Sequence, residues 1–235
     1  MKAVLHYLRL WDYASAGRVD RFIAPSRWTA ECVWRAYRRG SEVIYPPVDV
    51  DRFNPLLLRE DYYVVVSRLV QHKKVDLIVD AFSQLGLPLM VVGEGPDWDR
   101  VAERAAANIK MLGRQPDAVV QELLGRAKAF VHMAEEDFGI APVEAQAAGC
   151  PVIGYRGGGL LETVIEGKTG LFFTHQRADC LVSTIRQFER GEVQFNTEEI
   201  RLNAERFRKE RFQRELECLV EQSWGRWRRG WKGHD

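Results

Sequence analysis

The sequence contains no apolar run long enough to cross a membrane, and neither sign of charge dominates it. Lysine and arginine number 34 against 33 aspartates and glutamates, which leaves a net charge of +1. This balance gives no reason to expect a nucleic-acid partner. The longest apolar runs have the length of a strand rather than of a membrane span. The N-terminus reaches a second basic residue, Arg9, before any long apolar segment develops, so we expect no secretory signal peptide.

Cysteine is also scarce, and the common hydrolase signatures are missing. The four cysteines lie far apart without a C-x-x-C pair, which disfavours a zinc site and a disulfide framework. We therefore expect a reducing, cytoplasmic compartment. There is no G-x-S-x-G elbow and no H-E-x-x-H helix. None of the five histidines is expected to be catalytic, and only His72 is expected near a cleft.

From residue 62 onward, apolar strands alternate with helical patterns. The expected strands span 62–67, 87–92, 109–112, 129–133, 152–155 and 170–173. The expected helices span 75–85, 96–107, 116–126 and 160–166, with one more near Pro142 and charged helices at 178–190, 198–206 and 208–231. Strands that are apolar throughout predict a parallel sheet covered on both faces. The predicted fold class is α/β, a doubly wound parallel sheet with ligands at the carboxyl ends of its strands.

The first sixty residues have a different pattern. We expect a helix over 5–15, a strand at 21–24, a helix that Ser26 caps and Gly40 stops, and a strand at 42–45. Pro46 and Pro47 then stiffen the chain, and Asn54-Pro55 repeats this signal. We interpret residues 46–60 as an interdomain linker.

An acidic loop and a helix start form the most informative stretch, residues 135–153. Pro142 suits the first turn of a helix, and the open amides of residues 138–141 would then stabilise an anion. Glu136 in the loop and Glu144 in the expected first turn flank this anion site. Carboxylates beside a phosphate site suit the hydroxyls of a sugar or ribose, although Glu144 could simply cap the helix.

The same stretch resembles a known family. The spacing Glu136-x7-Glu144, with Phe138-Gly139 between and Pro151-Val152-Ile153 after, is similar to the donor-site signature of retaining GT-B glycosyltransferases. Further motifs of that family follow its order over about two hundred residues: Tyr45-Pro46-Pro47-Val48-Asp49, Ser67-Arg68-Leu69-Val70, Lys73-Lys74-Val75-Asp76, Val92-Gly93-Glu94-Gly95-Pro96, Leu112-Gly113-Arg114 and Gly157-Gly158 to Glu162-Thr163-Val164. The chain looks like the group 1 (family 4), mannosyltransferase-like type, mostly its C-terminal donor-binding half.

The resemblance implies a domain plan. GT-B enzymes have two Rossmann-like domains that face each other across a cleft. Residues 1–45 would be a remnant of the N-terminal acceptor domain, 46–60 the linker and 61–206 the nucleotide-sugar-binding domain. Residues 207–235 would form a C-terminal helical tail.

The resemblance also implies residue roles. Arg68 and Lys73 would hold the diphosphate of the donor, and Lys73 fits the family spacing better than Lys74. Glu136 would orient the sugar, and Glu144 would bind the ribose. The remaining substrate-binding residues would act largely through their backbone: Gly93, Gly113, Arg114, Phe138, Gly139 and Ile140.

Several of these residues also allow an interpretation without a binding role. Arg68 and Lys73 could belong to a solvated basic loop, and Arg114 could be a surface charge. Gly93-x-Gly95 lacks the third glycine of a dinucleotide fingerprint because Trp98 stands there, so we expect a tight loop rather than an NAD site. The glycines at 157–159 could approach a phosphate or sugar, or could form an ordinary turn. Glu162 is expected to be structural.

The C-terminus combines tryptophan with basic residues. Trp224, Trp227 and Trp231 recur at helical spacing beside Arg226, Arg228, Arg229 and Lys232. An interfacial membrane helix has this character. The preferred interpretation is a terminal helix that packs its tryptophans on a domain, with peripheral contact at the inner face of the membrane as the second.

The implied function is transfer of a hexose, with mannose as the first candidate, from a nucleotide-diphosphate sugar to a glycan or lipid-linked acceptor, with retention. We expect no cofactor and no metal, since the nucleotide sugar is a substrate and no Asp-x-Asp type site is recognised at the cleft. One alternative is a non-catalytic donor-binding fragment or one subunit of a split enzyme. Another is a sugar-nucleotide-responsive interaction protein. The expected partners include a separate N-terminal-domain polypeptide or a second copy of the chain.

Overall fold

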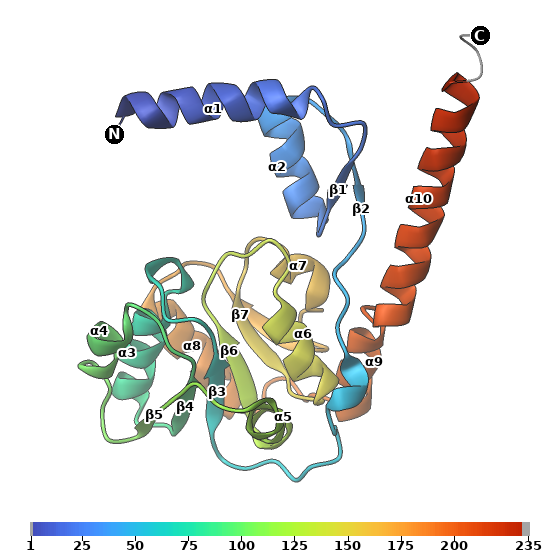
Figure 1. The fold of residues 1–235 in the computed structure, drawn as a ribbon. Helices are drawn as coiled ribbons and strands as arrows, with labels where there is room; N and C mark the ends of the chain where they lie inside the picture. Colours follow the sequence, from blue (N-terminus) through green and yellow to red (C-terminus); the bar gives the residue numbers. More distant parts are fainter. Residues whose placement is uncertain (1, 232–235) are drawn as a thin grey trace.

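The computed structural model describes residues 2–231 and contains one large parallel sheet (Figure 1). Its six strands lie in the order β5-β4-β3-β6-β7-β8, and every neighbouring pair is parallel. The strands are β3 (Tyr63–Val66), β4 (Leu89–Val92), β5 (Ile109–Gly113), β6 (Ala129–His132), β7 (Val152–Tyr155) and β8 (Gly170–Phe173). The predicted doubly wound α/β fold is confirmed.

Helices cover both faces of this sheet. They are α3 (Val75–Leu85), α4 (Trp98–Ala102), α5 (Asp117–Arg126), α6 (Ile140–Ala147), α7 (Leu160–Thr163), α8 (Ala178–Glu189) and α9 (Thr197–Glu205). Successive residues of β3 belong to different cores: Val64 packs with α5 and α6 residues, whereas Tyr63 and Val65 pack with α3 and α8 residues. Each face of the strand is therefore buried, which is why it is apolar throughout.

Three expected helices end earlier than their sequence patterns. The helix expected over 96–107 stops at Ala102, because residues 103–108 turn back toward β5 and Asn108 donates to the carbonyls of Phe82 and Leu87. The helix expected over 160–166 stops at Thr163, where the chain enters an extended residue, Val164. The helix expected to stop at Gly40 ends at Tyr37 instead. There Arg38 takes the left-handed conformation and its N–H bonds to the carbonyl of Trp34.

The N-terminal residues form a separate small unit. It consists of α1 (Lys2–Ala16), β1 (Phe22–Ala24), α2 (Arg27–Tyr37) and β2 (Ser41–Val43), and β1 and β2 form a two-stranded parallel sheet. Ser26 caps α2 as predicted, with its hydroxyl accepting from the N–H of Thr29. Figure 1 shows this unit beyond the α7 end of the large sheet, not added to its edge.

Glu162 links the small unit to the large sheet. Its carboxylate accepts from the backbone N–H groups of Arg27 and Trp28, each at 3.0 Å, and from the hydroxyl of Tyr45 at 3.0 Å. Glu162 thus occupies the positive end of α2, where an anion is stabilised. The residue has the structural role that its sequence position suggested.

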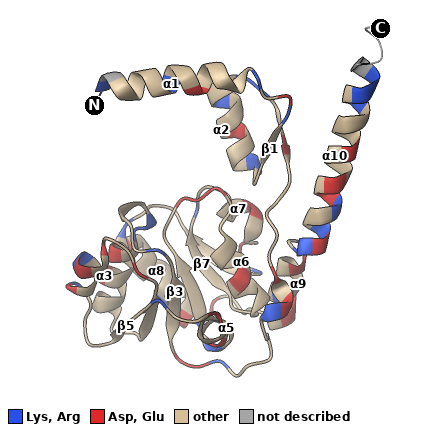
Figure 2. Cartoon of the chain, viewed as in Figure 1, with Lys and Arg blue, Asp and Glu red and all other residues tan. Residues whose placement is uncertain are grey.

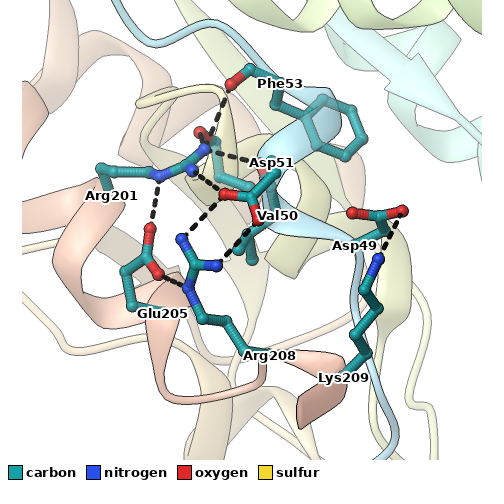
Figure 3. A network of polar contacts seen from close by, with 9 residues as sticks. Asp49, Val50, Asp51, Phe53, Arg201, Glu205, Arg208 and Lys209 are labelled. Carbon is teal, nitrogen blue, oxygen red and sulfur yellow. Dashed lines mark hydrogen bonds and ion pairs between the residues drawn. The ribbon is translucent and has the colours of Figure 1, made fainter.

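The segment after Pro47 packs closely on the large sheet. The 3-10 helix η1 (Val50–Arg52) carries Val50, which is 1% exposed, and Phe53 follows at 5%. Arg201 of α9 holds this segment by donating to the carbonyls of Val50 and Phe53 at 2.7 and 3.1 Å, and to the carbonyl of Ala147 at 2.6 Å (Figure 3).

Acidic partners surround this arginine. Asp51 accepts two hydrogen bonds of 2.8 Å from Arg208, and Glu205 accepts from both Arg201 and Arg208 (Figure 3). Hydrogen bonding to Arg208 lowers the pKa of the Asp51 carboxyl and of the Glu205 carboxyl. The network connects η1, α9 and the start of α10 (Lys209–Trp231).

Helix α10 extends away from the sheet (Figure 1). Trp224 and Trp227 stack with ring centroids 4.8 Å apart, and they are 56% and 54% exposed. They line an open groove that also contains Arg21 and Ile23 of the small unit. The side chain of Trp231 and residue Lys232 lie outside the described residues. None of the helices in the described part of the chain is both long and apolar enough to span a membrane.

Candidate functional site

The sheet has its topological switch point between β3 and β6. From β3 the chain proceeds outward through β4 and β5, whereas β6 begins the series that proceeds outward through β7 and β8. Loops that leave two such strands diverge in opposite directions and open a crevice at the carboxyl end of the sheet, where ligands bind in this class of fold.

On the β3 side, the loops surround an open cavity of about 960 Å³. It is lined by residues at or after the ends of three successive strands, among them Ser67, Arg68, Gly93, Glu94, Gly95, Trp98, Gly113, Arg114 and Gln115. Four of the predicted site residues, Arg68, Gly93, Gly113 and Arg114, are thus brought together. The Arg114 side chain is 82% exposed, and its guanidinium lies 3.9 Å from the Glu94 carboxylate. This distance is too long for a hydrogen bond.

Gly93 lets two of these loops touch through their backbones. Its φ is +132°, and a Cβ at this position would lie 1.8 Å from the carbonyl oxygen of Ser67. No larger residue fits there. The tight loop predicted from the partial glycine motif is present, and Trp98 lines the cavity beside it.

On the β6 side, the acidic loop carries Glu136 and leads into α6. Gly139 precedes the helix with φ +86°. The glycines after β7 support this loop: a Cβ on Gly158 would lie 2.3 Å from the carbonyl oxygen of Glu136, and the N–H of Gly159 donates to that oxygen at 2.7 Å. These glycines therefore make close backbone contact with the acidic loop and support its conformation.

Lys73 and Glu136 join the two sides of the switch point. The ammonium of Lys73 lies 2.5 Å from the carboxylate of Glu136, and both side chains are about one-fifth exposed. Between the two candidate lysines, Lys73 is therefore the one whose ammonium contacts the acidic loop. Lys74 takes the left-handed conformation, φ 56°, at the start of α3.

The sequence predicts Glu144 in the first turn of its helix, and the structure shows that this prediction is wrong. Helix α6 begins at Ile140, two residues before Pro142, because Gly139 already supplies the turn that starts it. Glu144 is consequently in the second turn, where it cannot cap the helix. Burial raises the pKa of the Glu144 carboxyl, the positive charge of Arg52 opposes this, and the negative charge of Asp117 adds to it.

The side chain of Phe138 belongs to the core. It is 4% exposed, and its ring lies 5.9 Å from that of Tyr45 and 5.3 Å from that of Phe207. Only the backbone of this predicted site residue is left to face a ligand. Ile140, the first residue of α6, is 48% exposed and remains accessible.

His132 lies next to the site, although this was not predicted from the sequence. It ends β6, it is 7% exposed, and its Nε2 lies 3.5 Å from a carboxylate oxygen of Glu136. Burial lowers the pKa of this imidazole, Glu136 raises it and Lys73 lowers it. Its position as the last residue of an apolar strand, four residues before Glu136, was the signal that could have identified it.

Several characterised proteins are similar to this chain. The alpha-1,3/1,6-mannosyltransferase alg2 of Schizosaccharomyces pombe is 27% identical over an alignment of 201 residues, and the match covers 64% of this chain and 40% of the relative. A GDP-mannose-dependent phosphatidylinositol monomannoside mannosyltransferase of Mycolicibacterium smegmatis is 29% identical over 178 residues, 61% of this chain and 46% of the relative. The chain therefore matches less than half the length of either protein.

Solved structures share the fold. Sucrose-phosphate synthase of Thermosynechococcus elongatus superimposes with a TM-score of 0.78 at 23% identity, over 88% of this chain and 59% of that one. Anabaena HepE, solved in complex with UDP and glucose, has a TM-score of 0.78 at 20% identity, over 90% of this chain and 66% of that one.

The family signature covers the part of the chain that builds the crevice. Residues 49–208, about two thirds of the chain, match the family described as glycosyl transferases group 1. This range includes every strand of the large sheet and all the loops at its carboxyl edge. The GT-B resemblance predicted from the motifs is confirmed, and the chain belongs to the group 1 glycosyltransferase family.

Proposed function

We propose that this chain binds a nucleoside-diphosphate sugar at the switch point and transfers its hexose, with retention, to a glycan or lipid-linked acceptor. The observation that carries the proposal is the Lys73–Glu136 pair, which joins the loops that follow β3 and β6, and Arg68 lines a cavity on the β3 side of the same switch point. A cation and a carboxylate that adjoin the same crevice match the two halves of such a donor, its diphosphate and its hydroxyl-rich sugar.

The chemistry follows from the charge that develops on the leaving group. Arg68 and Lys73 neutralise the diphosphate as the glycosidic bond breaks, and the amides at the start of α6 add to this stabilisation. Glu136 orients the sugar, and Glu144 binds the ribose. Positioning of donor and acceptor on one face accounts for the rate, because the Glu136 carboxylate is assigned to the sugar hydroxyls and not to attack on the anomeric carbon.

The relatives suggest which donors to test first. The mycobacterial relative is described as GDP-mannose-dependent, and the Anabaena structure contains UDP and glucose. GDP-mannose and UDP-glucose are therefore the first substrates to offer, with mannose as the preferred hexose.

Transfer is tested with the purified chain and a donor labelled in its sugar. We expect label to move into an extract of glycans and lipid-linked sugars. Calorimetric binding of the donor without any transfer would contradict the enzymatic part of the proposal and favour a non-catalytic donor-binding subunit.

The division of labour between the two glutamates gives a second prediction. Glu136→Gln should weaken binding of the sugar nucleotide about tenfold and leave the bare nucleoside diphosphate nearly unaffected, because its carboxylate serves the sugar. Glu144→Gln should weaken both ligands alike, because the ribose is common to them. Calorimetry on both variants measures this difference. Equal losses for the two ligands in Glu136→Gln would contradict the assignment.

We also infer that the chain associates through its small N-terminal unit. Helix α1 exposes apolar residues at positions i, i+3, i+4 and i+7, namely Val4, Tyr7, Leu8 and Trp11, which are 49–67% exposed. Figure 2 shows little charge along this helix. A two-stranded sheet is marginal on its own, and an open strand edge tends to find a partner.

Self-association, binding of a separate acceptor-domain polypeptide or adhesion to membranes should therefore be measurable. Light scattering at tens of micromolar, roughly the range where exposed apolar surface promotes aggregation, reports on the first of these. Trp11→Glu, placed in the exposed stripe, should reduce the association. A wild-type chain that is monomeric by light scattering and does not bind anionic liposomes would refute the inference.

A further inference from the structure

His132 presents a buried polar atom that nothing in the described part of the chain satisfies. Its side chain is 9% exposed, and its Nε2 has no hydrogen-bond partner there. The nearest charged group is the Glu136 carboxylate, at 3.5 Å, which is too long for a good hydrogen bond. Buried polar atoms are rarely left unpaired, so this nitrogen indicates a missing partner.

The surroundings define which kind of partner fits. Burial lowers the pKa of the imidazole and so favours its neutral form. The neutral ring has one N–H donor and one lone-pair acceptor, and a hydroxyl group can pair with either. Nε2, the buried nitrogen without a partner, therefore suits a hydroxyl group.

Two polar atoms thus converge at the end of β6. Nε2 of His132 and the near oxygen of Glu136 are 3.5 Å apart, so one molecule with neighbouring hydroxyl groups can contact both. Lys73 serves Glu136 in this structure. Stacking of the His132 ring on Phe130, with centroids 6.3 Å apart and planes 18° apart, holds the imidazole in this orientation.

We propose that His132 Nε2 and the Glu136 carboxylate together form hydrogen bonds with hydroxyl groups of the transferred sugar. This inference rests on the proposed function. When a donor binds, Lys73 moves to the diphosphate, and the hydroxyls replace it on Glu136 and fill the empty position on His132. The pair selects a donor sugar whose hydroxyls at the contacted positions are unsubstituted.

The test compares ligand preference in matched variants by calorimetry. Preference is the ratio of the dissociation constant of the bare nucleoside diphosphate to that of the sugar nucleotide. His132→Phe keeps the ring stacking but removes Nε2 and its hydrogen bond, and it should lower the preference about fivefold to tenfold. His175→Phe, at an exposed histidine after β8, is the control and should leave it unchanged.

Fluorinated donors identify the bond itself. A sugar nucleotide with fluorine in place of one hydroxyl cannot donate from that position. At the contacted position the substitution should weaken binding to the wild type about fivefold and add nothing to the effect of His132→Phe. Equal losses in wild type and variant at every position would overturn the proposal.

A measurement on the unmodified chain covers the case in which His132→Phe does not fold. The ¹⁵N resonance of His132 Nε2 should move on addition of the sugar nucleotide, because this nitrogen gains a hydrogen bond, and should not move with the bare nucleoside diphosphate. An unmoved resonance with a bound sugar nucleotide overturns only the role of His132. Failure of the wild type to bind either ligand overturns the proposed function as well.

Discussion

Replacing Arg68 with alanine should weaken the binding of GDP or UDP by about 1.5–3 kcal/mol, or about 10- to 150-fold, and leave the fold intact. The reason is that a guanidinium makes charge-assisted, paired hydrogen bonds to phosphate oxygens. Arg68 lines the cavity at the carboxyl end of β3, and its removal creates no hole in either core. Isothermal calorimetry with the nucleoside diphosphate measures the loss.

The control for this prediction is Lys110→Ala. Lys110 lies on β5 and is exposed, so its removal takes away one positive charge without touching the cavity lining. Its affinity for the nucleotide should equal that of the wild type within error. An unchanged affinity in Arg68→Ala, or an equal loss in Lys110→Ala, would mean that Arg68 does not hold the diphosphate.

Replacing Arg201 with alanine should lower the free energy of unfolding by about 3 kcal/mol. Its guanidinium satisfies the carbonyls of Val50, Phe53 and Ala147, and its side chain is only 18% exposed. Alanine leaves these oxygens without their donor and removes one partner of Glu205. The midpoint of urea unfolding should shift while the slope of the transition stays constant.

Arg190→Ala is the matched control. Arg190 also pairs with a nearby glutamate, Glu192, but its side chain is 61% exposed. Pairs of this kind contribute little, so the free energy of unfolding should change by no more than about 0.5 kcal/mol. Similar shifts in the two variants would show that the carbonyl contacts of Arg201 do not stabilise the chain.

The large sheet was predictable because its signals are local and agree with one another. Strands such as Val152–Tyr155 are short, apolar and bounded by turn residues, and helix α3 has the same bounds in the sequence pattern and in the structure. The misplaced helix ends depend on distant contacts instead. Helix α4 ends where Asn108 bonds to carbonyls around residues 82 and 87, and no local pattern encodes those partners.

The residue types of the site were predictable, and their connections were not. The family resemblance assigned Arg68, Lys73 and Glu136 to the donor site, and each follows a strand that ends at the same edge of the sheet. The pairing of Lys73 with Glu136 joins residues 63 positions apart, and the contact of His132 with Glu136 depends on how the acidic loop folds back over β6. Gly158 and Gly159 make close backbone contact with that loop, whereas their sequence suggested an approach to a phosphate or sugar, or an ordinary turn.

Calorimetry of the purified chain with GDP, UDP and ADP, each bare and as its hexose conjugate, tests the central claim most directly. The claim is that the crevice between β3 and β6 is a nucleotide-sugar site. We predict that the chain binds one base in both forms, that Arg68→Ala weakens both, and that Glu136→Gln weakens only the conjugate. Absence of binding heat for all six ligands, with the chain folded, would contradict it.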